Sequence, residues 1–259
     1  MYKALFFDLS GVLYVGPQAI PGAVEAIKRA QASDLEIRFV TNTSRKTCNQ
    51  IYDDLIALGF DIDLRQIYTA PAAVKALLKQ RQWRPYCLIH KNIQSEFADL
   101  EQSRPNAVVI GDAEDGFCYE TLDHAFQLCQ NGATLIGIGR NRYFKLGGQL
   151  HLDAGPFIHA IEYAATTEAL IVGKPSAEFF NQIVASTTAP ADTILMVGDD
   201  IFGDVEGALN AGLQACLVKT GKYQPGDENQ LARRFLCVDS VVEAVDVALN
   251  DADDASQKE

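Results

Sequence analysis

The feature that most constrains this chain is a repeated alternation of short apolar runs, each ending in a polar residue, with amphipathic stretches. The runs ALFFD (4–8), EIRFVTN (36–42), ALIVGKP (169–175) and ILMVGDD (194–200) predict buried parallel strands. Between them, apolar residues recur at helical spacing, as in the stretch that follows Pro21. This alternation predicts an α/β fold with a mostly parallel sheet and helices on both of its faces.

A second alternating stretch lies between about Pro71 and Glu168. Its predicted strands are CLIH, AVVIGD and TLIGIG, and its predicted helices include SEFADLEQ and YETLDHAFQLCQNG. The stretch either extends the first sheet or forms an inserted α/β unit, and the pattern leaves both open with the insertion preferred. We therefore expect a discontinuous core of residues 1–70 and 169–259, and an inserted domain of residues 71–168.

Charge and composition narrow the classes of partner and compartment. Lys and Arg number 22 against 34 Asp and Glu, which gives a net charge of −12 and disfavours nucleic acid and anionic membranes as partners. No apolar run approaches the roughly 18 residues that span a bilayer, and the N-terminus lacks a signal-peptide pattern. The six cysteines show no zinc-ligand spacing. We expect a cytoplasmic protein with reduced thiols.

Four polar residues follow strand ends at widely separated positions: Asp8, Thr41, Lys174 and Asp199. Ligands of parallel sheets bind at the carboxyl ends of strands, so one sheet edge can gather all four. Two neighbouring carboxylates are tolerated when one is protonated or a cation lies between them. A site of oxygen ligands suits Mg²⁺, and Lys174 with the Thr41 hydroxyl would complete a pocket for a tetrahedral dianion.

These residues lie in four motifs: FFDLSGVLY, FVTNTS, VGKP and MVGDDIFGD. In this order they resemble the haloacid dehalogenase-like (HAD) phosphohydrolases. The Thr-Asn pair and the large insert are similar to the NagD-type subfamily, IIA, which carries a C2-type α/β cap. The resemblance implies a Rossmann-like core, an inserted cap over the sheet edge, a phosphatase with a Mg²⁺ cofactor, and a small phosphorylated substrate. Exposed faces of such caps can also pair two copies into a homodimer.

The resemblance implies a role for each matching residue. Asp8 would be the nucleophile that forms an aspartyl phosphate, and Lys174 would neutralise charge beside it. Asp200 and Asp204 would orient metal-bound waters or Lys174. The implied Mg²⁺ ligands are Asp8, the backbone carbonyl of Ser10 and Asp199, and the implied phosphate-binding residues are Asp8, Leu9, Ser10, Thr41, Asn42 and Lys174.

Ser10 departs from the family pattern, because most family phosphatases have a general-acid Asp at this position. Losing general acid catalysis costs about 10²–10⁴-fold in rate, most severely for alkoxide leaving groups. Pyrophosphate leaves more easily, and a protonated phosphoramidate nitrogen leaves as a neutral amine. We therefore expect a preference for P–O–P or P–N substrates, or activated aryl esters, over sugar phosphates.

Two other functions remain open at this point: a phospho-ligand-binding or regulatory protein with vestigial turnover, and a phosphotransferase that uses the same aspartyl phosphate. In the inserted unit, Arg140, Arg142, Tyr143 and Lys145 either contact the leaving group or form a solvated hairpin. Arg45 either lies near the phosphate or interacts with a helix end. The four histidines show neither zinc nor dyad spacing and are expected to be structural.

Overall fold

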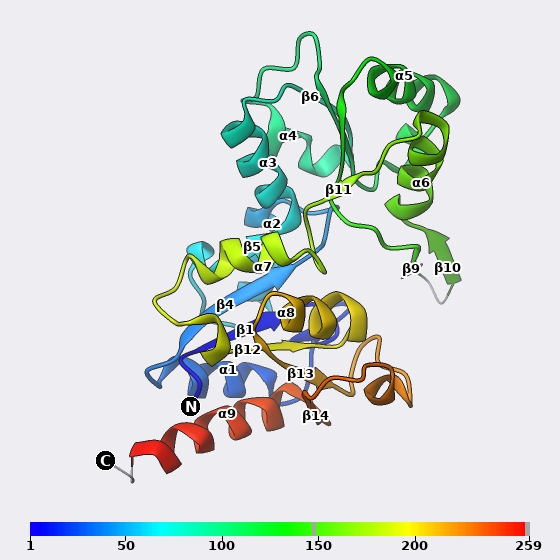
Figure 1. Cartoon of the computed structure of the whole chain (residues 1–259). Helices are drawn as coiled ribbons and strands as arrows, with labels where there is room; N and C mark the ends of the chain where they lie inside the picture. Colours follow the sequence, from blue (N-terminus) through cyan, green and yellow to red (C-terminus); the bar gives the residue numbers. More distant parts are fainter. Residues whose placement is uncertain (147–148, 257–259) are drawn as a thin grey trace. The chain divides into compact units, whose positions relative to one another are not determined.

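The computed structural model describes residues 1–146 and 149–256, which divide into two compact units (Figure 1). The first unit comprises Met1–Thr41, Cys48–Tyr68 and the chain from Lys174 onward. The second comprises Asn42–Thr47 and Thr69–Gly173. Both contain parallel sheets with helices, which confirms the predicted α/β class.

The sheet of the first unit has six strands, in the order β14-β13-β12-β1-β4-β5. The described pairings are parallel, and every residue of β1 is buried, as expected for a central strand covered on both faces. The chain first adds β4 and β5 on one side of β1 and later adds β12, β13 and β14 on the other. In parallel sheets ligands bind where the strand order reverses, so this reversal makes the carboxyl ends of β1 and β12 the expected ligand-binding position. The strands are β1 (Ala4–Asp8), β4 (Glu36–Thr41), β5 (Ile67–Thr69), β12 (Ile194–Gly198), β13 (Gln214–Val218) and β14 (Leu236–Val238).

Helices cover both faces of this sheet (Figure 1). In α1 (Ala23–Gln31), buried residues at positions 23, 26, 27 and 30 form one apolar stripe, which joins a core cluster with residues of α2 (Cys48–Ala57), α9 (Val241–Ser256) and the strands. On the face opposite α1 and α9 lie α7 (Ala177–Val184) and α8 (Gly207–Asn210). A π-helical turn, Ile201–Glu206, leads into α8, and a small hairpin, β2 (Tyr14–Val15) and β3 (Gln18–Ala19), follows β1.

The second unit has its own four-stranded parallel sheet, in the order β11-β8-β7-β6. Residues of α5 and α6 pack on this sheet in a second core cluster. The strands are β6 (Pro85–Leu88), β7 (Ala107–Ile110), β8 (Thr134–Gly137) and β11 (Leu170–Ile171), and an antiparallel hairpin is formed by β9 (Tyr143–Leu146) and β10 (Gln149–Leu152). The helices are α3 (Ala70–Arg81), α4 (Gln94–Phe97), α5 (Tyr119–Gln130) and α6 (Ala154–Ala165).

The structure differs from the predicted boundary at one apolar run. The run 169–175 is predicted as a strand of the core, yet β11 pairs with β8, where Leu170 is opposite Ile136. The second unit therefore continues to Gly173, and the first resumes at Lys174 rather than at residue 169. An apolar run shows that a strand is buried but does not show which sheet it joins. The assignment of the second unit as a cap stays a prediction.

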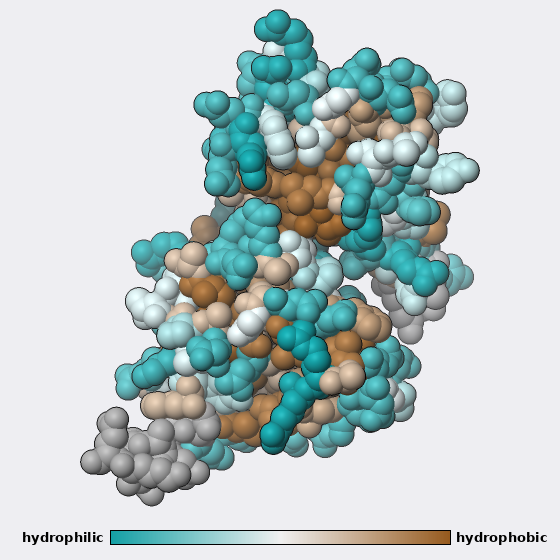
Figure 2. Space-filling view, in the orientation of Figure 1, coloured by the Kyte–Doolittle hydropathy of each residue, from teal (hydrophilic) through white to brown (hydrophobic). Residues whose placement is uncertain are grey.

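On the face drawn in Figure 2, hydrophobic residues of the first unit are scattered among hydrophilic ones, whereas the second unit shows one continuous hydrophobic area. Within residues 1–146 and 149–256, every helix is too short or too polar to cross a membrane. The predictions about homodimer formation and nucleic acid stay predictions.

Candidate active site

Four charged side chains are buried together in the first unit: Asp8, Lys174, Asp199 and Asp204, each no more than 7% exposed. Asp8 is the last residue of β1, and Asp199 follows β12 directly. The Lys174 ammonium donates hydrogen bonds to Asp8 Oδ1 and, at 2.6 Å, to Asp204 Oδ1. Because β1 and β12 are parallel neighbours, their carboxyl ends bring Asp8 and Asp199 to the same sheet edge.

Two glycines make room for the Asp199 carboxylate. Gly11 and Gly221 have φ values of +92° and +59°, a left-handed region that other residues rarely adopt. A Cβ on Gly11 would lie 1.9 Å from Asp199 Oδ2, and one on Gly221 would lie 2.0 Å from it. The Lys222 backbone N–H donates to the same oxygen at 2.7 Å. The loops after β1 and β13 therefore enclose Asp199 with backbone rather than with side chains.

Asp204 and Asp200 are fixed by the π-helical turn. Asp204 Oδ2 accepts from the Asp200 backbone N–H at 3.2 Å. Asp200 Oδ1 accepts from the backbone N–H groups of Phe202 and Gly203 at 3.1 and 2.9 Å, and its Oδ2 pairs with the Lys222 ammonium at 3.1 Å. Asp204 thus uses both carboxylate oxygens inside the protein, whereas the hydrogen bonds described for Asp8 and Asp199 engage one oxygen each.

Burial and mutual repulsion dominate the electrostatics. Desolvation, with added repulsion from Asp8 and Asp204, raises the pKa of Asp199 to about 8. Burial also raises the pKa of Asp204, although the Lys174 ammonium opposes this shift. Burial lowers the pKa of Lys174, but Asp204 and Asp8 outweigh it, so the net shift is upward. The carboxylates of Asp8, Asp199 and Asp204 each place an oxygen within 4.8 Å of the others. One ammonium among these carboxylates leaves the cluster with excess negative charge.

The remaining predicted residues are divided between the two units. Leu9 is buried, and its carbonyl accepts from the Leu13 N–H at 2.8 Å, while Ser10 is exposed. Thr41 is buried at the end of β4, next to the register position where Val40 faces Asp8. Asn42 belongs to the second unit, where its Oδ1 lies 2.6 Å from the position a Cβ on Gly173 would occupy. Its predicted phosphate contact stays a prediction.

In the second unit, Arg45 is held by two carboxylates and a ring. Its guanidinium donates to Asp112 Oδ2, lies 3.1 Å from Glu114 Oε1, and sits 4.3 Å from the centre of the Phe144 ring. Neither of the two roles considered for Arg45 included this pairing. Arg140, Arg142 and Tyr143 lie at the start of the hairpin, and the side chain of Lys145 lies outside the described part of the structure.

Sequence reasoning missed Lys222, Gly11 and Gly221 as parts of the site. Lys222 and Gly221 lie in the segment LVKTGKY, and Gly11 follows Ser10 directly. A glycine next to a motif residue is a usable signal, but the close approach to Asp199 comes from loops 210 residues apart (221 − 11). A single sequence does not reveal that approach.

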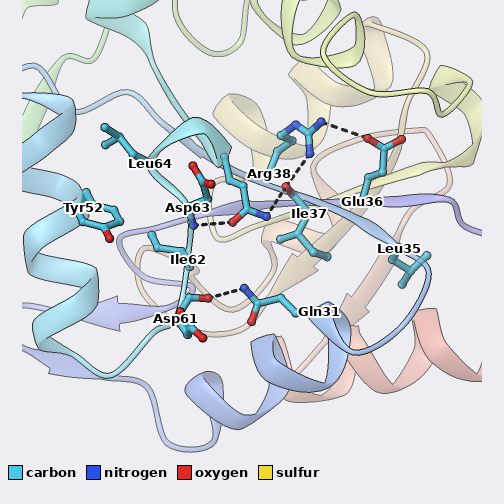
Figure 3. A pocket seen from close by; sticks show the side chains of 11 residues that line it. Gln31, Leu35, Glu36, Ile37, Arg38, Tyr52, Asp61, Ile62, Asp63 and Leu64 are labelled. Atoms are coloured by element: carbon cyan, nitrogen blue, oxygen red, sulfur yellow. Dashed lines mark hydrogen bonds and ion pairs between the residues drawn. The ribbon is translucent and has the colours of Figure 1, made fainter.

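A hollow of about 790 Å³ in the same unit is separate from this cluster (Figure 3). It lies beside the start of β4, where Glu36 is opposite Ala4, whereas Asp8 lies at the other end of β1. Its polar groups bond to one another and to neighbouring residues outside the hollow: Arg38 contacts Glu36 at 3.2 Å, the Gln31 amide donates to the Asp61 carbonyl at 2.6 Å, and Glu36 accepts from the Thr188 N–H at 2.7 Å. This hollow has none of the four clustered residues in its lining.

Comparisons with known proteins identify the family to which the chain belongs. Residues 5–102 match the family model for haloacid dehalogenase-like hydrolases, and residues 171–244 match a HAD-hydrolase-like model. The chain is 44% identical to the phospholysine phosphohistidine inorganic pyrophosphate phosphatase of Rattus norvegicus, over 97% of this chain and 96% of that protein. It is 42% identical to haloacid dehalogenase-like hydrolase domain-containing protein 2 of Bos taurus, over 94% of this chain and 95% of that protein.

A crystal structure of a hypothetical protein from Pyrococcus horikoshii has the same fold, with a TM-score of 0.87 and 27% identity over 95% of this chain and 99% of that one. The chain therefore belongs to the haloacid dehalogenase-like hydrolase family. NagD of E. coli K-12, the type that the motifs predicted, shares the fold, with a TM-score of 0.84 and 22% identity over 93% of this chain and 98% of that one. The predicted Rossmann-like core with a second α/β unit and the predicted enzyme class, a phosphatase, are confirmed at this level.

Proposed function

We propose that this chain is a Mg²⁺-dependent phosphohydrolase in which Asp8 forms an aspartyl phosphate. The observation that carries the proposal is the buried arrangement of Asp8, Lys174, Asp199 and Asp204 at one sheet edge. Burying several carboxylates with a single ammonium lowers the stability of the fold. Such clusters of perturbed charged groups concentrate at functional sites. Asp8 also has the sequence position of the family nucleophile.

The donors present fit Mg²⁺. The Asp8 and Asp199 carboxyl groups lie close together, and oxygen atoms are the ligands that Mg²⁺ prefers. Asp204, whose two oxygens are engaged by Lys174 and the Asp200 N–H, would orient Lys174 rather than bind the ion. The proposed ligands are therefore Asp8, Asp199 and the Ser10 carbonyl. When bound, Mg²⁺ supplies charge neutralisation and a template for phosphate oxygens.

The proposed reaction has two steps at one oxygen of Asp8. The carboxylate attacks phosphorus, an Asp8–phosphorus bond forms, and the bond between phosphorus and the leaving group breaks. Water then attacks the aspartyl phosphate, which releases inorganic phosphate and restores the carboxylate. Lys174 compensates negative charge at Asp8 in both steps, with Thr41, Asn42 and the Leu9–Ser10 backbone proposed to hold the phosphoryl group. Asp200 and Asp204 keep Lys174 and the loop in place.

Ser10 points to the substrate class. Because a serine hydroxyl cannot act as a carboxylic acid near neutral pH, leaving groups that need little protonation are favoured. Pyrophosphate, phosphoramidates and aryl phosphates meet this condition better than sugar phosphates. The 44%-identical relative is named for phospholysine, phosphohistidine and inorganic pyrophosphate, which are P–N and P–O–P compounds.

The test is a phosphate-release panel of pyrophosphate, phospholysine, an aryl phosphate and a sugar phosphate, with and without Mg²⁺. We expect Mg²⁺-dependent turnover of the first three, with the sugar phosphate slowest. The matched variant Ser10→Asp should raise sugar-phosphate turnover by about 10–100-fold relative to pyrophosphate, since it restores a general acid. Sugar phosphates turned over best by the unaltered chain would contradict the proposed substrate class.

The same panel separates the other two functions. Tight binding of these compounds without turnover, unchanged in Asp8→Asn, would instead support a binding or regulatory protein. Transfer of the phosphoryl group to added glycerol in preference to water would support a phosphotransferase. The proposed hydrolase requires water to be the main acceptor at all glycerol concentrations tested.

A further inference from the structure

The β9–β10 hairpin and α6 of the second unit enclose a groove of about 800 Å³. One wall is the cross-strand pair Tyr143 and Leu152, which are 56% and 64% exposed. Pro156 and His159 of α6 form the other wall. Two large apolar side chains left this exposed, facing a hollow, are a typical feature of a binding surface.

The segment that carries the charges of the groove is fixed in place. The Gly155 N–H donates to the Asn141 carbonyl at 2.9 Å, and the Asp153 N–H donates to the Arg142 carbonyl at 3.3 Å. A Cβ on Gly155 would lie 2.5 Å from the Asn141 carbonyl oxygen, so this close approach requires glycine. These contacts hold the backbone of residues 140–142 against the start of α6.

The two arginines of this segment differ in their partners. Arg140 is paired with Glu162, whose carboxylate also accepts from the Ala169 N–H at 2.8 Å. Arg142 is exposed, and among the described residues its guanidinium has no acidic partner. The lining thus combines two arginines and two histidines with a single carboxylate, in a chain whose net charge is −12. This local excess of donors and positive charge is complementary to an anion.

We propose that this groove binds a small aromatic anion, with its ring against Tyr143 and Leu152 and its acidic group on Arg142. Aromatic rings stack on a tyrosine face and pack on leucine, and a guanidinium binds a carboxylate, sulfonate or phosphate through two parallel hydrogen bonds. The contact residues lie within the second unit, and the binding does not depend on the catalytic role of Asp8.

The test is a fluorescence titration of the full chain with 8-anilinonaphthalene-1-sulfonate, an aromatic sulfonate that the proposed hydrolase cannot cleave. We expect saturable binding at one site per chain, weakened about tenfold in Arg142→Gln, since a charge-assisted pair contributes on the order of one decade in affinity. Arg142→Lys should retain part of the affinity. The matched control is Arg104→Gln, an exposed arginine of the same unit outside the groove, which should bind like the unaltered chain.

A second arm maps the site by amide chemical shifts. We expect the dye to move resonances of residues 140–144 and 151–162, and Leu152→Ser to weaken binding while leaving the far-ultraviolet circular dichroism unchanged. If no saturable binding is seen up to about 1 mM dye, the proposal is overturned. Equal affinities of Arg142→Gln and Arg104→Gln would overturn it as well, as would shifts confined to the first unit.

Discussion

Each unit contains a cation held between two carboxylates, and the two arrangements differ in charge balance. In the first unit, Lys174 joins Asp8 and Asp204, and all three side chains are at least nine-tenths buried. In the second, Arg45 joins Asp112 and Glu114, with Arg45 and Glu114 being 32% and 38% exposed. The second arrangement adds His90, which lies 3.1 Å from Glu114, and the first adds a further carboxylate, Asp199.

The difference supports the first arrangement as the proposed catalytic site. Around Arg45, the added histidine donates to Glu114, and the exposure of Arg45 and Glu114 to water reduces the cost of the remaining negative charge. Around Lys174, the added group repels the others, and burial removes the solvent that would screen them. The excess negative charge of the first arrangement attracts a divalent cation, and a bound cation would in turn offset the charge of a phosphoryl group. The contacts of Arg45 connect the 42–47 loop, the residues after β7 and the hairpin, which indicates a structural role for the second arrangement.

The largest expected effect comes from removing the buried cation. Lys174→Met should lower phosphate release by about 10²–10³-fold and lower the free energy of unfolding by about 3–5 kcal/mol, because it leaves two carboxylates buried without their partner. Denaturant unfolding and steady-state assays measure both. Lys79→Met is the matched control, because Lys79 pairs with Asp99 at the surface, and it should change stability by less than about 1 kcal/mol. Equal losses in the two variants would contradict the comparison.

Magnesium should stabilise the unaltered chain by about 2.7 kcal/mol at a concentration one hundred times its dissociation constant, through mass action alone. Asp199→Asn removes a proposed ligand and should abolish most of this stabilisation, measured as the shift in melting temperature with added Mg²⁺. Asp112→Asn, the corresponding change in the second unit, should leave the magnesium-dependent shift intact. A full shift in Asp199→Asn would show that the ion binds elsewhere.

The metal-free chain should lose stability as pH rises from about 5 to about 8. The pKa of Asp199 is raised from 3.8 to about 8 by burial and by Asp8 and Asp204, so the folded state holds a proton that the unfolded state has released. Unfolding then releases a proton, and the free energy of unfolding falls by at most about 1.4 kcal/mol per pH unit in this window. Asp199→Asn should flatten the slope, which pH-dependent denaturant unfolding in EDTA measures. A slope that is unchanged in the variant would contradict this origin.

The smallest effect is expected at the second arrangement. Arg45→Met should lower the free energy of unfolding by about 1–2 kcal/mol, because Asp112 is buried while Arg45 and Glu114 remain partly solvated. Phosphate release should stay within about tenfold of the unaltered chain if Arg45 acts as a clamp rather than at the reacting phosphorus. If Arg45→Met lowered phosphate release and stability as much as Lys174→Met, the proposed difference between the two arrangements would be wrong.

The sequence alone predicts much of the first unit, including its central strand and the residues of the buried cluster. The apolar run 4–8 coincides with β1, and the four motifs locate the clustered residues, because strand ends and charged residues are local features. The assignment of β11 failed because sheet membership depends on pairing with β8. The roles of Gly11 and Gly221 around Asp199, and the pairing of Arg45 with Asp112, were missed for the same reason: they depend on approaches between distant segments.

The proposed nucleophilic role of Asp8 requires one of its oxygens to become bonded to phosphorus during turnover. The direct measurement is rapid quenching of the chain during turnover of pyrophosphate, borohydride reduction, and mass spectrometry of the peptide that contains residue 8. We expect conversion of Asp8 to homoserine, which requires substrate and Mg²⁺ and is absent in Asp8→Asn. Turnover at full rate with residue 8 unmodified at every quench time would contradict this role of Asp8. Homoserine formed at another aspartate would contradict it as well.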